Sequence, residues 1–192
     1  MKKPNKKAMQ QAVQQFLLAA GLDLSEENLI DTPKRVTDAW ADEFLAGYQQ
    51  QPSRILQERF SLNSPSEREL VVVTHLRFQS MCPHHLLPYA GVAHIAYVPG
   101  KAVVGFGRLA TLLAAFSQRL ILQEALAQEV AGALMHELKS QGAACILEAE
   151  QTCLRLRGEL QHDAVTHAEA YKGLLAEPDM RREVWARIPP RR

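Results

Sequence analysis

Apolar residues in the first fifty positions recur at the spacing of an α-helix. The stretch 8–20 carries them at roughly helical intervals and stops before Gly21. Thr32 and Pro33 begin a second helix, because a threonine oxygen accepts an unpaired amide and proline fits the first helical position. Apolar residues then repeat every four positions as far as Gly47. The sequence therefore predicts an N-terminal helical extension over residues 1–50.

After a connecting loop predicted for 49–65, the pattern changes to strands and long helices. The elements expected are a strand over 70–78, a strand over 92–98, one or two helices over 109–138, a strand over 143–157, and a segment over 163–171 that pairs with it. A short helix closes the chain. This order predicts an α+β fold with an antiparallel sheet, and residues 51–192 form its main domain.

Composition and charge narrow the class of protein. The chain has 192 residues, 47% hydrophobic and 22% charged, and a net charge of +1. Its first seven residues hold four lysines and no acid, so the remainder is slightly acidic. Such a body lacks a general basic field for nucleic acid. No secretory signal and no membrane-spanning stretch is visible, and three cysteines are typical of a reducing compartment. We expect a cytoplasmic protein with neither membrane nor nucleic-acid partners.

The densest chemical signal is the segment from Cys82 to His85, with the sequence Cys-Pro-His-His. A thiolate and an imidazole three positions apart can reach one metal ion from a tight turn, and zinc accepts both. Of the other two cysteines, Cys145 lies among apolar residues and Cys153 near two arginines. We expect Cys153 to be the third ligand and Cys145 to lie in the core. Three buried free cysteines are the alternative interpretation.

Three protein ligands rather than four would leave a coordination position for water, as catalytic zinc sites do. A bound zinc ion lowers the pKa of that water from 15.7 to about 7. His84, next to the ligand pair, would then be an acid–base group.

Two further groups have a chemical and an ordinary interpretation. On the strand expected over 143–157, Gln151, Cys153, Arg155 and Arg157 would share one face, where arginines suit a phosphate or carboxylate. The alternative is a solvated sheet face. Gln123 and Glu124 begin a helix. The Glu124 carboxylate would accept two hydrogen bonds from a guanine edge. The alternative is a surface glutamate.

Taken together, the sequence resembles the GTP cyclohydrolase I family over roughly residues 29–188. The residues that carry the resemblance, in order, are Thr32-Pro33 with Arg35, Asp42-Glu43, Cys82 with His84 and His85, Val104-Gly105, Gln123-Glu124, Cys153 and Arg157-Gly158. The resemblance implies the tunnelling fold (T-fold), in which antiparallel sheets of several subunits form a barrel with helices outside. It also implies a homo-oligomer, typically a decamer, with active sites at subunit interfaces.

The resemblance further implies the reaction and the role of each residue. The family hydrolyses the imidazole ring of GTP at C8, releases formate and closes a pterin ring to give 7,8-dihydroneopterin triphosphate. By similarity, Cys82, His85 and Cys153 are the zinc (Zn²⁺) ligands and His84 is the catalytic histidine. Gln123 and Glu124 are similar to the guanine-recognition pair, and Arg157, Arg108 and Arg35 to members of the triphosphate site.

The sequence departs from the family pattern where protons and phosphates are handled. Gln151 stands where the family has a histidine thought to protonate the purine, and glutamine delivers no proton near pH 7. His167, on the neighbouring strand, is a candidate for the missing imidazole; an exposed sheet histidine is the alternative. Gly107, Arg108 and Thr111 replace a Ser-Lys and a later Arg; Asp38 replaces a cation, and Pro83 a glutamate.

These departures leave three interpretations open. The first is a zinc-dependent cyclohydrolase acting on GTP. The second is a paralogue acting on another purine nucleotide or nucleoside, and the third is a non-catalytic pterin- or nucleotide-binding oligomer.

Overall fold

The computed structural model describes residues 3–63 and 69–190. Its main sheet has four antiparallel strands in the order β2-β3-β5-β6. These strands are β2 (Val71–Met81), β3 (Pro88–Val98), β5 (Gly142–Gln151) and β6 (Thr166–Gly173). The predicted α+β class with an antiparallel sheet is confirmed, and the last two strands pair as expected.

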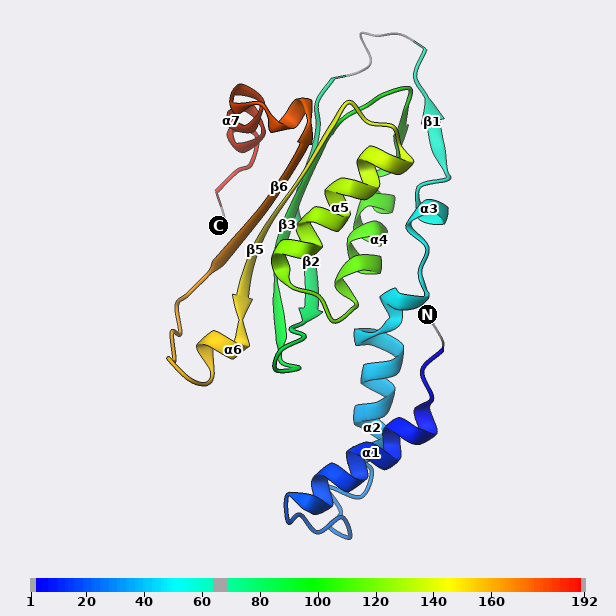
Figure 1. The fold of residues 1–192 in the computed structure, drawn as a ribbon, viewed down its shortest axis with the longest axis vertical. Coiled ribbons are helices and arrows are strands. Elements are labelled where there is room, and N and C mark those ends of the chain that lie inside the picture. The colour runs from blue at the N-terminus through cyan, green and yellow to red at the C-terminus, as the bar shows by residue number, and fades with distance from the viewer. Residues whose placement is uncertain (1–2, 64–68, 191–192) are drawn as a thin grey trace.

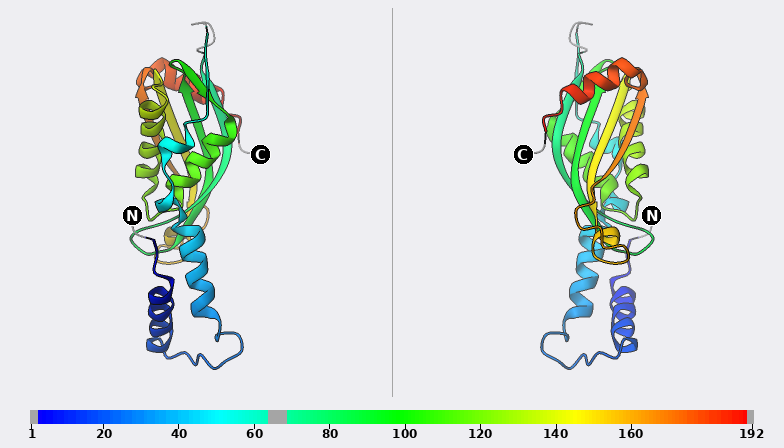
Figure 2. Two further views of the ribbon diagram at one scale, coloured as in Figure 1. Left: turned by 90° about the vertical axis from the view of Figure 1, so that its right-hand side faces the viewer. Right: turned by 90° about the vertical axis from the view of Figure 1, so that its left-hand side faces the viewer.

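Helices α4 (Phe106–Ser117) and α5 (Gln123–Glu137) cover one face of this sheet (Figures 1 and 2). The stretch 109–138 thus forms two helices. Helix α7 (Pro178–Ala186) covers one end of the opposite face, where Val184 packs with Ile146. The two long helices pack on one side of the sheet, and α7 adds a short helix at one end of the other face. In the described ranges, no helix combines the length and the apolar character that crossing a bilayer requires.

Strand alternation sets which side chains of β5 face the two long helices. Cys145, Leu147 and Ala149 belong to the large core between sheet and helices. Glu148 lies between two of them in sequence, so its side chain projects to the other face. This parity separates the candidate residues on β5 and β6 into two sets.

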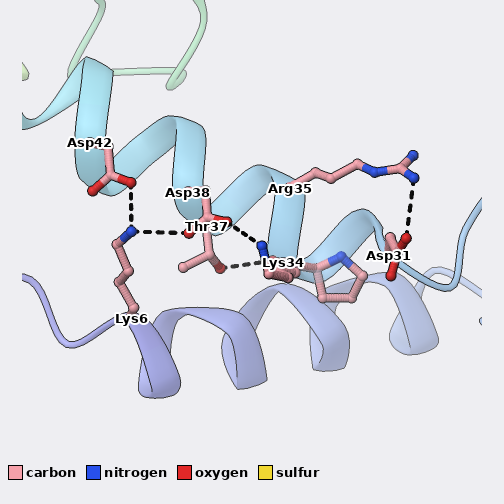
Figure 3. A network of polar contacts seen from close by, with 8 residues as sticks. Lys6, Asp31, Lys34, Arg35, Thr37, Asp38 and Asp42 are labelled. Atoms are coloured by element: carbon pink, nitrogen blue, oxygen red, sulfur yellow. Dashed lines mark hydrogen bonds and ion pairs between the residues drawn. The ribbon is translucent and has the colours of Figure 1, made fainter.

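The N-terminal segment forms α1 (Lys6–Ala19) and α2 (Thr32–Ala39), which lie side by side beyond one end of the body (Figure 1). Lys6 joins α1 to α2 and to the turn after it, because its ammonium group bonds Asp38 at 3.0 Å and Asp42 at 2.5 Å (Figure 3). The second helix does not run to Gly47 as predicted. A π-helical turn over Trp40–Phe44 follows α2, and a 3-10 turn over Ala46–Gln49 contains the glycine.

The segment 49–65 was expected to be a loop, and that prediction is wrong over much of its length. Helix α3 (Pro52–Ile55) and strand β1 (Arg59–Ser61) form there, and β1 pairs with β4 (Ala102–Val104). Residues 64 and 65 of the expected loop lie outside the described ranges. Elements of three or four residues are too short to show a periodic pattern, so contacts with the rest of the fold decide their structure.

The strand predicted over 143–157 ends early. Strand β5 stops at Gln151, and the next four residues form the one-turn helix α6 (Thr152–Arg155). The Thr152 hydroxyl donates a hydrogen bond to the Pro88 carbonyl and so fixes this turn against the start of β3. The change from strand to helix decides where Cys153 lies.

Candidate metal centre

Two loops at one end of the sheet bring two thiols and an imidazole together. Cys82 follows β2, His85 lies three residues further on, and Cys153 is on α6. One possible ligand atom from each lies within 4.8 Å of the other two. Thiolate and imidazole are the donors that zinc and similar transition metals bind. The three residues predicted as ligands therefore form a group that fits a metal ion.

The loop that carries Cys82 and His85 is closed by its own backbone. The Cys82 N–H donates to the Leu87 carbonyl at 2.9 Å, and the Leu86 N–H donates to the Cys82 carbonyl at 2.9 Å. Leu86 takes a left-handed backbone with φ of 54°. The loop is anchored from outside as well, because Met81 bridges to Leu120 between α4 and α5. These hydrogen bonds fix the positions of Cys82 and His85 within one short turn.

The predicted common face of Gln151, Cys153, Arg155 and Arg157 does not form, because the chain leaves the strand at Gln151. Arg155 instead forms an ion pair with Glu150. Arg157 turns toward the metal group, with its Nη1 atom 3.4 Å from Nε2 of His85. One cation thus lies beside the three ligand candidates.

The neighbouring Cys82 affects the ionisation of Cys153. Burial raises the pKa of Cys153, the neighbouring Cys82 raises it further, and Arg157 opposes both effects. A metal ion bound beside Cys153 would favour the deprotonated thiol that metal ligation requires. Cys145, in contrast, is fully buried in the core, and burial raises its pKa strongly. The prediction that Cys145 is a core residue is confirmed.

Glu124 lies exposed in the first turn of α5, on the same side of the molecule as the metal group. Its charge and that of Cys82 both act on Tyr89, although burial is the main cause that raises the pKa of this phenol to about 12. The Tyr89 hydroxyl donates to the Ile121 carbonyl at 2.9 Å, two residues before α5. This hydrogen bond ties the start of β3 to the segment that leads into Glu124.

Gln123 has a different environment from Glu124, although the two are adjacent in sequence. Its side chain is buried, and Nε2 donates to the carbonyls of Leu147 and Thr166 at 3.1 and 3.0 Å. Its Oε1 accepts from Nε2 of Gln151 at 2.9 Å and from the Thr166 hydroxyl at 2.6 Å. The predicted contact of Gln123 with substrate stays a prediction, and in this structure its amide binds the protein itself.

His84 is exposed beside the metal group. Its ring lies 6.3 Å from that of His85, centre to centre, and nearly perpendicular to it. The His84 imidazole therefore extends from the Cys82–His85 turn into solvent.

Three predicted residues lie apart from this group within one chain. His167 pairs in register with Glu148, so it projects from the sheet face opposite Gln151. Arg35 is on α2 in the N-terminal segment, where it pairs with Asp31 at 3.2 Å. His167 therefore does not replace the imidazole missing at Gln151 within the same chain.

Arg108 is the third residue that lies apart. It is near the start of α4 and forms an ion pair with Glu58. The far end of α4 leads to Leu120, which bridges to Met81 beside Cys82. A helix rises about 1.5 Å per residue, so roughly 15 Å separates Arg108 from the metal end of its own chain.

Two residues of this region were not predicted from the sequence. Tyr89 bonds the segment just before α5, and Thr166 completes the hydrogen bonds of Gln123. Neither belongs to a motif, and only the pairing of distant strands brings them here. A buried tyrosine or a strand-end threonine has no sequence signal that separates it from an ordinary one.

The amino-acid sequence is similar to those of known proteins of one family. Residues 9–189 match the family described as GTP cyclohydrolase I. The chain is 40% identical over 164 residues to GTP cyclohydrolase 1 of Corynebacterium glutamicum (strain ATCC 13032), covering 84% of this chain and 82% of the relative. It is 38% identical over 178 residues to GTP cyclohydrolase 1 of Bacillus subtilis (strain 168), covering 92% of each chain. The protein of that name from Bifidobacterium longum (strain DJO10A) is 36% identical over 185 residues, 96% of this chain and 91% of the relative.

Proposed function

The chain belongs to the GTP cyclohydrolase I family, and we propose that it hydrolyses the guanine imidazole ring of GTP, releases formate and forms 7,8-dihydroneopterin triphosphate. The observation that carries the proposal is the convergence of Cys82, His85 and Cys153 within 4.8 Å. These residues would hold the metal, which we propose to be zinc because its preferred donors match the set. A zinc ion with three protein ligands supplies an activated water near neutral pH.

The chain's own residues bind and orient the substrate around that position. Glu124 accepts hydrogen bonds from the planar N–H pair of guanine, a charge-assisted contact that selects this base. Its exposed position in the first turn of α5 leaves both carboxylate oxygens accessible. Arg157, beside His85, holds an oxygen of the substrate's phosphate groups.

His84 is the group proposed to move protons. It is exposed and adjacent to a ligand candidate, and imidazole is the side chain best suited to proton transfer near neutral pH. Gln151 holds its amide against Gln123 and transfers no proton. In this proposal, His84 carries the proton transfers near the ring, and Gln151 only holds groups in place.

A homo-oligomer, a decamer by family resemblance, completes the site. Strands β2 and β6 are the two edges of the described sheet, and β2 is eleven residues long. Open edges of this length are covered in stable proteins, and pairing with further copies covers them. Arg35, Arg108 and His167 lie away from the metal group of their own chain, so in this proposal they act at a neighbour's site.

The proposal is tested by product analysis. Purified protein incubated with GTP should release formate and give a fluorescent pterin after oxidation, with about one metal ion per chain. Cys153→Ser should lose both metal and product, whereas Cys145→Ala, which changes a buried cysteine outside the group, should keep both. Metal-loaded wild-type protein that gives neither product would refute the proposed activity.

The altered cation set favours a second candidate, a guanine nucleotide with fewer phosphates. Asp38 bonds Lys6 and Lys34, and Arg108 pairs with Glu58. These pairs reduce the positive charge available to a triphosphate. Rates with GTP, GDP, GMP and guanosine distinguish the candidates, and a strong preference for GTP would exclude the second.

A further inference from the structure

We propose that Gln123, Gln151 and Thr166 form a buried brace that positions the Cys153 turn against the start of α5. We call these three residues the amide brace. The proposal rests on the proposed function for the roles of Cys153 and Glu124. It assigns Gln123 and Gln151 to positioning rather than to contact with the substrate.

The orientation of the central amide follows from its surroundings. Nε2 of Gln123 faces the carbonyls of Leu147 and Thr166, which only accept hydrogen bonds. The other end of the amide must therefore be the oxygen. Both hydrogens and both lone pairs of Gln123 then have protein partners, in a side chain whose residue is 4% exposed.

The groups that contact the Gln123 oxygen must be hydrogen-bond donors. The oxygen of Gln123 faces Gln151 and Thr166, so each of these must present a hydrogen to it. Gln151 meets this requirement with Nε2. Thr166 meets it with its hydroxyl, whose single hydrogen faces the Gln123 oxygen at 2.6 Å and the Ala149 carbonyl at 3.0 Å. An acceptor at position 151 would place two oxygens against each other in a buried site, which is strongly unfavourable.

The brace connects the two halves of the proposed site. Gln151 is the last residue of β5 and is directly followed by α6, which carries Cys153. Gln123 is the first residue of α5 and is directly followed by Glu124. A hydrogen bond from Gln151 to Gln123 therefore fixes the metal ligand relative to the carboxylate that would hold guanine, and Thr166 ties both to β6.

The test measures Co²⁺ binding, because cobalt in a thiolate site has an absorption spectrum that reports ligand geometry. Gln151→Met keeps the size of the side chain and removes the hydrogen. We expect it to weaken Co²⁺ binding on the order of 10-fold, to change the spectrum and to raise KM for GTP more than it lowers kcat. Gln151→Glu should have a larger effect, whereas Gln151→His, which donates from its ring, should bind Co²⁺ as wild type does.

Gln141 provides a matched control. It lies just before the other end of β5, and its Nε2 donates to the Pro99 carbonyl at 3.0 Å. Gln141→Met should leave Co²⁺ affinity and spectrum unchanged. An equal loss in Gln141→Met and Gln151→Met would show general destabilisation and overturn the brace.

Thr166 allows the test even if position 151 tolerates no change. Thr166→Val removes the second donor at a residue distant in sequence from the ligands, and Thr166→Ser keeps it. We expect Thr166→Val to shift the Co²⁺ spectrum and Thr166→Ser to restore it. Wild-type binding and spectra in Gln151→Met, Gln151→Glu and Thr166→Val would refute the inference. Because Co²⁺ binding needs no turnover, this result is separate from the presence or absence of cyclohydrolase activity.

Discussion

At the scale of single residues, Glu124 is the side chain whose charge the proposed specificity requires. A carboxylate accepts two hydrogen bonds from guanine, whereas an amide of the same shape offers one acceptor and turns a donor toward the base. Hydrogen bonds to a charged group contribute about 1.5–3 kcal/mol each, so Glu124→Gln should lower kcat/KM for GTP roughly 10- to 100-fold. Steady-state kinetics measure this loss.

Glu129, five residues further along α5 and also exposed, is the control for that substitution. Glu129→Gln removes the same charge from the same helix and should leave kcat/KM within about twofold, because surface charge alone contributes little. Equal losses in the two variants would mean that the helix's charge, and not the position of Glu124, matters.

The protonation of buried His94 should make the free energy of unfolding depend on pH. It is buried on β3, its Nδ1 accepts from the His75 backbone N–H at 3.4 Å, and its Nε2 lies 3.2 Å from Glu148. Burial lowers the pKa of His94, Glu148 opposes this effect and His75 adds to it. The folded protein therefore keeps the ring neutral to lower pH than the unfolded chain does. The contribution of His94 is intact above about pH 6.5 and is lost as the pH falls toward its folded-state pKa.

Urea unfolding between pH 5 and 7.5 measures this linkage. The free energy of unfolding should fall below about pH 6.5 in the wild type, and more weakly in His94→Gln. His162→Gln, at an exposed position on a loop, should reproduce the wild-type dependence. The difference between the curves isolates His94 from the protonation of the metal ligands. Parallel curves for wild type and His94→Gln would contradict the assignment.

At the scale of elements, Lys6 supplies the ion pairs that join α1 to α2 and to the turn after α2. Lys6 bonds Asp38 and Asp42, and no residue of α1 is buried (Figure 3). An exposed helix held in this way should loosen in salt, because ions screen the pairs. Lys6→Ala should speed amide hydrogen exchange of α1 at low salt and leave α4 and α5 unchanged. High salt should remove the difference between variant and wild type.

Lys7→Ala is the matched control for this contact. It removes the next lysine of the same helix, which is exposed. Exchange of α1 should then remain close to that of the wild type. Faster exchange of α1 in Lys7→Ala than in Lys6→Ala would show that helix charge in general, and not the bonds of Lys6, holds the helix.

The length of an element decides whether the sequence predicts it. Long elements with a clear period, such as α1, α4 and β3, are predicted, because burial of one face imposes that period. Helix α6 is missed because a single turn has no period and the apolar alternation of β5 runs into it. The identities of Cys82, His85 and Cys153 as a group are predicted from chemistry. The position of Arg157 and the hydrogen bonds of Gln123 depend on contacts between strands far apart in the sequence, which no local pattern contains.

At the scale of the whole molecule, the proposed site is divided between chains. Arg108 lies near the start of α4, at the end remote from the metal group, so in the proposed oligomer it reaches substrate only at a neighbour's site. Arg108→Ala and Cys153→Ser should each be inactive or nearly so. Co-expressed chains that assemble at random should recover roughly a quarter of wild-type activity, because half of the sites keep Cys153 and half of those meet an intact Arg108.

The control co-expresses Cys82→Ser chains with Cys153→Ser chains. Both cysteines belong to the metal group of one chain, so every site in the mixed oligomer lacks a ligand and activity should stay at the level of the single variants. Differently tagged chains, purified through both tags, ensure that mixed oligomers are measured. Recovery in both mixtures would mean that ligands cross between chains, whereas recovery in neither would mean that Arg108 acts within its own chain or not at all. Only recovery confined to the Arg108 mixture agrees with a site assembled from one chain's metal group and its neighbour's arginine.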